Sequence, residues 1–151
     1  ICVNNLKVLT TFVDKMKTKD PLFKAMFRRV FYGGSYYDGL RVGKPEEFDL
    51  DLLLDIPTYA QPVLMESNIP GFVHLQVKNF DGWMKQPEAK PGYANFKKLF
   101  DDKFFLSTEK VLAWMHGVIQ ITFNDFSPSS NGVYTFQNPT GTFKVNYLHI
   151  I

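Results

Sequence analysis

Three acidic residues alternate with apolar residues in the segment 47–52. Glu47, Asp49 and Asp51 fall two residues apart, and in a strand this period places all three on one face, at steps of about 6.5–7 Å. Like charges at that spacing repel, so the cluster requires either a solvated edge strand or bound cations. Mg²⁺ is commonly held by one or two carboxylates together with substrate phosphates, and paired metals serve phosphoryl transfer. The pattern therefore indicates a metal-dependent phosphoryl-transfer site as the alternative to a solvated face.

A glycine-rich turn precedes this segment. In Gly33-Gly34-Ser35 the glycines can direct backbone N–H groups at a phosphate, and Ser35 adds a hydroxyl. The same glycines could also end a helix. Eleven residues separate Ser35 from Glu47. The order is thus a phosphate-binding turn, a connector and an acidic strand.

This order resembles the polymerase-beta-like nucleotidyltransferases, in which Gly-Ser is followed after about ten residues by acid-apolar-acid. Residues 33–57 read GGSYYDGLRVGKPEEFDLDLLLDIP. Part of this segment is similar to the cyclic GMP-AMP synthase-like receptors and their male-abnormal (Mab) relatives. The similar residues are Gly34-Ser35-Tyr36-Tyr37, Pro45, Glu47-Phe48-Asp49 and Ile56-Pro57. The resemblance implies an enzyme that joins ATP and GTP into a cyclic dinucleotide when it senses double-stranded nucleic acid. It also implies a role in innate immune, antiviral signalling. The single cysteine favours a reducing, intracellular setting, and we expect a cytoplasmic location.

The resemblance also implies roles for individual residues. Glu47 and Asp49 match the first two metal-binding carboxylates, which would hold two Mg²⁺ or Mn²⁺ ions. Gly34 and Ser35 match the turn that holds the nucleotide triphosphate. Asp51 matches no ligand of the family, although a register of Asp49 and Asp51 is the alternative, since thirteen residues from Ser35 to Asp49 also fit the looser motif.

The third carboxylate of the superfamily is expected on a later strand, and Asn146 stands at that position, within 143–148. An amide is neutral, so Asn146 cannot act as a base, and it is a weaker ligand for a hard cation. Three explanations stay open: an engineered substitution, a natural change that marks a weak or inactive enzyme, or a different alignment of this strand. The nearest other acid, Asp125, is expected at a helix end and fits poorly.

Two other functions therefore stay open. One is a catalytically inactive member of the same family, which binds nucleotide or has a developmental or structural role. The other is a template-independent enzyme that adds nucleotides to RNA ends.

Periodicity predicts the elements that position these residues. A long helix occupies the N-terminus, and Asp20 caps a second helix that starts at Pro21 and is stopped by Gly33-Gly34. The expected fold is α/β, a nucleotidyltransferase fold with a mixed twisted sheet and the long N-terminal helix as its spine. The other expected elements are strands over 47–56 and 72–77, a loop over 85–92, a helix from Ser107 to about Ile121, and a hairpin of strands 132–137 and 143–151. Residues 52–54 are expected as the buried interior of the first strand. Ser107 is expected as the N-cap of the helix, whose core face would be Val111, Leu112, Met115, Val118, Ile119 and Thr122.

Length and composition favour one globular domain, residues 1–151. Hydrophobic residues make up 45% and aromatic residues 16% of the chain, enough for a core. The single cysteine excludes an internal disulfide, and neither a signal peptide nor an apolar run long enough to span a membrane is visible. Because the chain lacks an initiator Met and stops within an apolar strand, we expect a fragment of a two-lobed protein without its helical C-terminal lobe.

The net charge of +2 does not by itself imply a nucleic-acid partner, so any basic surface must be local. Lys17, Lys24 and Arg28 are the candidates, with Lys24 and Arg28 four residues apart on one helical face. The resemblance favours double-stranded RNA as the activator, with DNA as the alternative, and leaves open a dimer on the nucleic acid. An ordinary solvated face is the competing interpretation. His74 and His116 lie in apolar segments and are expected in the core.

Overall fold

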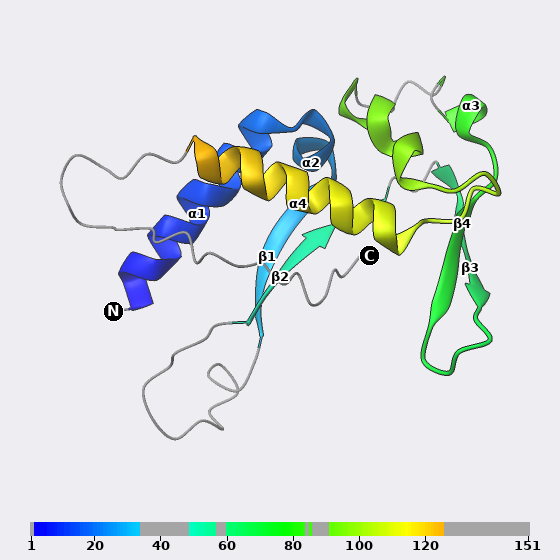
Figure 1. Ribbon diagram of the computed structural model, residues 1–151, viewed down its shortest axis with the longest axis horizontal. Coiled ribbons are helices and arrows are strands. Elements are labelled where there is room, and N and C mark those ends of the chain that lie inside the picture. Colours follow the sequence, from blue (N-terminus) through cyan, green and yellow to red (C-terminus); the bar gives the residue numbers. More distant parts are fainter. Residues whose placement is uncertain (1, 34–48, 57–59, 84, 86–90, 126–151) are drawn as a thin grey trace.

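The computed structural model describes residues 2–33, 49–56, 60–83, 85 and 91–125, and all structural statements concern these residues (Figure 1). Helices α1 and α4 lie against each other at one end, with α2 and the β1–β2 ladder beside them, and the β3–β4 hairpin projects at the other end. The predicted strands 132–137 and 143–151 lie outside the described residues.

The two N-terminal helices meet at Asp20, as predicted. Helix α1 (Cys2–Lys19) buries Val13 and Met16, one turn apart on the face toward the core. Asp20 has an extended backbone and caps α2 (Pro21–Met26), because the Phe23 backbone N–H donates to Asp20 Oδ1 at 2.6 Å. The proline suits the first helical position, where an N–H would have no partner within the helix.

The second helix is much shorter than predicted. We expected it to run to Gly33-Gly34, but it ends at Met26 and strand β1 (Phe27–Gly33) follows. The reason is a competing hydrogen bond: the Asp55 backbone N–H donates to the Met26 carbonyl oxygen at 2.7 Å. This bond starts the pairing with the next strand, so pairing overrides the helical spacing of Phe27 and Val30.

Strand β2 (Asp49–Leu54) pairs antiparallel with β1. The register places Gly33 opposite Asp49, Phe31 opposite Asp51 and Arg29 opposite Leu53, with an irregularity between Phe27 and Arg29. Leu53 and Leu54 are buried and Leu52 is half-buried, which agrees with the predicted strand interior. The sequence therefore located this strand correctly.

The hairpin joins β3 (Pro62–Glu66) to β4 (Val73–Val77). Only β4 was predicted. The C-terminal end of β4 also bonds to the segment 104–106: the Val77 N–H donates to the Phe104 carbonyl, and the Leu106 N–H donates to the Leu75 carbonyl. All of β3 is exposed.

Helix α4 (Thr108–Asn124) follows its predicted N-cap, Ser107, whose hydroxyl accepts from the Lys110 N–H. Its buried residues match the predicted core face, whereas Leu112 and Ile119 are half-buried. Two short elements that were not predicted precede it, the helix α3 (Phe80–Trp83) and the 3-10 helix η2 (Pro91–Leu99). The buried residues of α4 are Val111, Met115, Val118 and Thr122.

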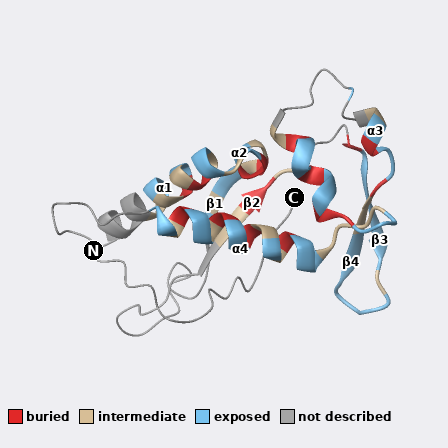
Figure 2. Ribbon diagram, turned by 45° about the horizontal axis from the view of Figure 1, so that its top comes forward, coloured by how far each residue is buried: buried red, intermediate tan, exposed pale blue. Residues whose placement is uncertain are grey.

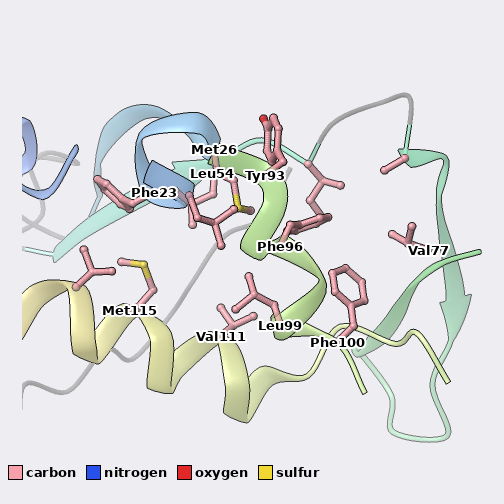
Figure 3. Packing of buried hydrophobic residues seen from close by; sticks show 14 of the residues in the cluster. Phe23, Met26, Leu54, Val77, Tyr93, Phe96, Leu99, Phe100, Val111 and Met115 are labelled. Atoms are coloured by element: carbon pink, nitrogen blue, oxygen red, sulfur yellow. The ribbon is translucent and has the colours of Figure 1, made fainter. Parts of the chain in front are cut away.

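One hydrophobic cluster joins α1, α2, α4 and η2 (Figure 2, Figure 3). Phe96 and Phe100 of the η2 region meet edge to face, with ring centroids 4.9 Å apart, and Phe80 packs on Phe100 in the same way. Leu54 joins this cluster from β2 and is fully buried. The acidic strand is therefore anchored to the core at its C-terminal end.

The prediction that His74 and His116 lie in the core is wrong, because both are exposed. His74 lies in β4 with its ring edge against Phe105, at 5.8 Å between centroids. His116 directly follows the buried Met115 in α4, so the helical turn carries it away from the core.

The fold class agrees with the prediction: helices pack with antiparallel strands, and α1 is a long N-terminal helix. Within the described ranges no helix is long and apolar enough to cross a membrane.

Candidate nucleotide and metal site

The β1–β2 ladder brings the two halves of the sequence motif together. Gly33, which opens the Gly-Gly-Ser turn, is the direct partner of Asp49, the first residue of β2. Fifteen residues (34–48) separate them in the sequence, yet opposite residues of an antiparallel pair have Cα atoms only about 4.5–5.5 Å apart. The end of this ladder is therefore the place where turn and acidic strand meet.

The two faces of β2 differ in character. Positions 49, 51 and 53 share one face by strand alternation. Leu52 and its partner Val30 are on the other face and pack against the hydrophobic core. The side chain of Asp51 is half-buried. The acidic positions thus lie on the face of the ladder that is turned away from the helices.

Most of the predicted site residues lie outside the described residues: Gly34, Ser35, Glu47 and Asn146. Of the predicted metal and nucleotide ligands, the described part of the chain contains only Asp49, and its backbone position alone. In that part no group of three or more His, Cys, Asp or Glu residues could hold a metal ion. The assignment of the metal ligands therefore stays a prediction.

The structure corrects the geometry of the predicted basic surface. Lys24 lies in α2 and Arg28 in β1, so they do not share a helical face. The cause is the helix end at Met26, which places a strand where helical spacing was assumed. Arg28 instead lies 3.3 Å from Asp55 Oδ1.

Lys17 is also engaged within the chain. Its Nζ lies 2.9 Å from Asp14 Oδ1 and 4.3 Å from the centroid of the Phe27 ring. Lys24 and Arg29 are exposed. The positive charge of this region is thus partly balanced by neighbouring carboxylates, which weakens but does not remove the field toward an anion.

A cluster that was not predicted from the sequence links α1 to the end of α4. Asp125 is the C-cap residue of α4, and its Oδ2 lies 2.6 Å from Lys19 Nζ and 3.4 Å from Lys15 Nζ. Lys15 also donates to the Asp125 backbone carbonyl. These lysines hold the pKa of Asp125 below its ordinary value, Lys19 first through its hydrogen bond. The available signal was the four-residue spacing of Lys15 and Lys19 on one helical face.

Comparisons with known proteins agree with this architecture. The family model for the Mab-21 protein nucleotidyltransferase domain matches residues 36–147. The chain is 59% identical, over 141 residues, to a cyclic GMP-AMP synthase-like receptor of Tribolium castaneum, covering 93% of this chain and 35% of that protein. It is 38% identical over 138 residues to a cyclic GMP-AMP synthase-like receptor of Aethina tumida, covering 91% and 34%.

A shorter match of 64 residues, 34% identical, links the chain to a cyclic GMP-AMP synthase-like protein of Drosophila melanogaster. The chain spans about a third of the length of the Tribolium and Aethina relatives. The family model covers well over half of the chain and includes the acidic strand. The chain therefore belongs to the Mab-21 nucleotidyltransferase family.

Proposed function

We propose that this protein is a nucleotidyltransferase that joins ATP and GTP into a cyclic dinucleotide of the cyclic GMP-AMP type. The observation that carries the proposal is the pairing of Gly33 with Asp49. It supports a site at the end of the ladder, where a phosphate-binding turn and an acidic strand adjoin. The names of the Tribolium and Aethina relatives, cyclic GMP-AMP synthase-like receptors, favour this product class.

In this proposal each motif residue has a defined task. The backbone at Gly34 and the Ser35 hydroxyl bind the triphosphate, because N–H and O–H donors match phosphate oxygens. Glu47 and Asp49 hold two Mg²⁺ or Mn²⁺ ions, since hard divalent cations prefer carboxylate oxygen. The bound ions supply charge neutralisation for the triphosphate and activation of the attacking hydroxyl.

The reaction is a substitution at the α-phosphorus of a nucleoside triphosphate. A ribose hydroxyl oxygen forms a bond to that phosphorus, the bond to pyrophosphate breaks, and the hydroxyl proton passes to solvent water. A cyclic dinucleotide needs two such substitutions and releases two pyrophosphates. Asn146 cannot accept this proton because an amide is not a base at neutral pH. The chain with Asn146 is therefore proposed to transfer slowly.

Double-stranded RNA is the proposed activator, with double-stranded DNA as the alternative. The exposed cations of α2 and β1, Lys24 and Arg29, support a polyanionic activator. The relatives' name, cyclic GMP-AMP synthase-like receptor, supports an activating ligand without naming it. Sensing of foreign nucleic acid in the cytoplasm, as part of antiviral immunity, belongs to the same proposal.

A second function is specifically favoured by Asn146. If this residue is native and disabling, the protein binds nucleotide without turning it over, or has a structural or developmental role. The binding of metal and triphosphate requires Glu47, Asp49 and Ser35, none of which is altered from the motif.

The test is product formation by the protein and by Asn146→Asp. Each is incubated with labelled ATP and GTP, Mg²⁺ or Mn²⁺, and double-stranded RNA or DNA, and phosphatase-resistant products are measured. We expect Asn146→Asp to form cyclic dinucleotide much faster than the unaltered chain. If neither forms product but both bind nucleotide, the non-catalytic function replaces the enzymatic one.

A further inference from the structure

Phe31 is a large apolar side chain exposed beside the acidic strand. It is 49% exposed in the middle of β1, opposite Asp51. The other large apolar residues exposed in the described ranges lie on the β3–β4 hairpin and its turn, or at Ile121 in α4. Phe31 therefore stands apart from them, on the ladder that carries the candidate site.

The register places Phe31 on the acidic face. Directly opposite residues of an antiparallel pair share a face, so Phe31 lies on the face of positions 49 and 51. Val30, its neighbour in sequence, is on the other face and packs against the core. Phe31 is two residues from Gly33, a distance of about 7 Å along the strand. An aromatic ring thus lies within one nucleotide's reach of the acidic end.

An exposed phenyl ring next to carboxylates offers a planar apolar surface that a bound ligand can bury. Burial of apolar side chains on this face already occurs at Leu53, which is 5% exposed, but it does not extend to Phe31. A nucleobase is a suitable cover, because it is planar, carries no charge that the carboxylates would repel, and stacks on aromatic rings whatever its sequence identity. A phosphate would instead be repelled by Asp51.

We propose that Phe31 stacks against the base of a nucleotide whose triphosphate is bound at the Gly33–Asp49 end of the ladder. This assignment rests on the proposed function, because it requires a nucleoside triphosphate at the acidic strand. Stacking contributes affinity through the base alone. Phe31 is thus a nucleotide-positioning residue that acts on the base and leaves the phosphates to the turn.

The experiment compares ligands with and without a base. Mn²⁺-dependent binding of ATP, GTP and inorganic tripolyphosphate is measured for the protein and for Phe31→Ala, Phe31→Leu and Phe31→Trp. Leucine keeps apolar volume without a π face, and tryptophan keeps the stacking surface. Phe72→Ala is the matched control, because Phe72 is a similarly exposed phenylalanine beside the β3–β4 hairpin.

We expect Phe31→Ala and Phe31→Leu to weaken ATP and GTP binding by about 5- to 150-fold, since base–aromatic stacking contributes about 1–3 kcal/mol. Tripolyphosphate binding stays unchanged in every variant, and Phe31→Trp and Phe72→Ala bind ATP like the unaltered protein. Phe31→Leu and Phe31→Trp keep the comparison valid if Phe31→Ala does not fold.

Three results overturn the inference. If Phe31→Leu binds ATP as tightly as the unaltered protein, no base stacks on this ring, and a polypeptide segment is the remaining candidate to cover it. If ATP and tripolyphosphate weaken together, Phe31 supports the phosphate site through the fold. If the unaltered protein binds neither ATP nor tripolyphosphate, the proposed function itself fails, and this assignment fails with it.

Discussion

Asp20 makes contacts in two directions at the junction of α1 and α2. One carboxylate oxygen accepts from the Phe23 N–H at 2.6 Å, and the other accepts from the Trp114 indole N–H at 3.3 Å. The first contact starts α2 and the second ties this junction to α4. One side chain thus fixes both the local helix start and the position of a helix that lies 94 residues away in sequence.

Replacement of Asp20 by alanine is expected to lower the free energy of unfolding by about 1–2 kcal/mol, the usual cost of losing an N-cap. The half-buried indole N–H of Trp114 also loses its acceptor. Urea unfolding, followed by tryptophan fluorescence, measures the change. Asp20→Asn is the control, because its amide oxygen still caps the helix. Equal stability of Asp20→Ala and the unaltered protein would contradict this role.

The Asp125 carboxylate gives a second prediction, which concerns how its contribution to stability depends on pH. Its pKa in the folded chain lies below the ordinary value of 3.8, chiefly through Lys19 and then Lys15. Because the pKa of Asp125 is lower in the folded than in the unfolded chain, its ionised carboxylate stabilises the fold above about pH 4. This stabilisation is lost as the pH falls through the pKa of the folded state. We therefore expect Asp125→Asn to lower the melting temperature at pH 7 but to lose this effect at low pH.

Thermal melts of both proteins between pH 7 and pH 2 check this sign. Added salt should reduce the difference at pH 7, because the side chains of Lys15, Lys19 and Asp125 are 31%, 33% and 53% exposed and solvent-accessible ion pairs are screened. A difference that persists unchanged below the folded pKa would show that Asp125 acts through something other than its charge.

At the scale of elements, the packing of η2 on α2 depends on Gly92. A Cβ atom at this position would overlap the Pro21 carbonyl oxygen and approach Ala25 Cβ. The Tyr93 hydroxyl donates to the Ala25 carbonyl at 2.9 Å, so the same turn of α2 is contacted twice. These contacts hold the aromatic residues of η2 against the core.

We expect Gly92→Ala to destabilise the protein by about 1–3 kcal/mol, because the backbone of α2 or η2 must shift. Gly117→Ala is the matched control: nothing lies within 4 Å of a Cβ there, in the middle of α4. Alanine in an exposed helix interior should stabilise by about 0.5–1 kcal/mol. Melting temperatures that move in the same direction for both variants would contradict the close approach at Gly92.

Several helices and strands were predictable from the sequence, and others were not. Caps at Asp20 and Ser107, the alternation of β2 and the core face of α4 are local signals, and the structure agrees with them. The end of α2 at Met26 was not predictable in this way, because it depends on a hydrogen bond from Asp55, far along the chain. Strand β3 was missed because it is wholly exposed. The 3-10 helix η2 was missed because it begins at Pro91, inside the Pro-, Lys- and Gly-rich segment 85–92, so the predicted loop is wrong at residues 91–92.

Some features of the candidate site were likewise predictable from the sequence, and others were visible only in the structure. Gly33, Asp49 and Asp51 were identified from residue types and spacing, and the ladder register then brought Gly33 and Asp49 opposite each other. The prediction that Lys24 and Arg28 share a face was wrong, because it assumed a continuous helix through both residues. Phe31 carried no sequence signal, since a phenylalanine in an apolar run predicts burial and only the structure shows its exposure.

At the scale of the whole molecule, the described residues form one hydrophobic core with the ladder on one side and the hairpin at one end. The acidic end of the ladder and the exposed cations of α2 and β1 belong to the same α2–β1–β2 unit. Any effect of nucleic acid on the site can therefore pass through short-range contacts. The Arg28–Asp55 pair is one of them, because it joins β1 to the residue that follows β2.

The basic residues of this unit give a prediction for nucleic-acid binding. We expect Lys24→Ala and Arg28→Ala each to weaken double-stranded RNA binding and to lower the slope of log K against log salt by about 1, as one phosphate contact is lost. Fluorescence anisotropy between 50 and 200 mM salt measures this, and Lys85→Ala, an exposed lysine outside this unit, is the control. Unchanged affinity and slope in both variants would favour the ordinary solvated face.

Mn²⁺-dependent binding of ATP by the protein and by Asp49→Asn tests the proposed metal and triphosphate site directly. The exposed Asp102 provides a control substitution, Asp102→Asn, with the same change of charge. We expect the protein and Asp102→Asn to bind Mn²⁺ and ATP together, and Asp49→Asn to lose at least about tenfold in affinity, since a neutral amide is a weaker ligand for a hard cation than a carboxylate. Equal binding by all three proteins would contradict a metal and triphosphate site at the Gly33–Asp49 end of the ladder.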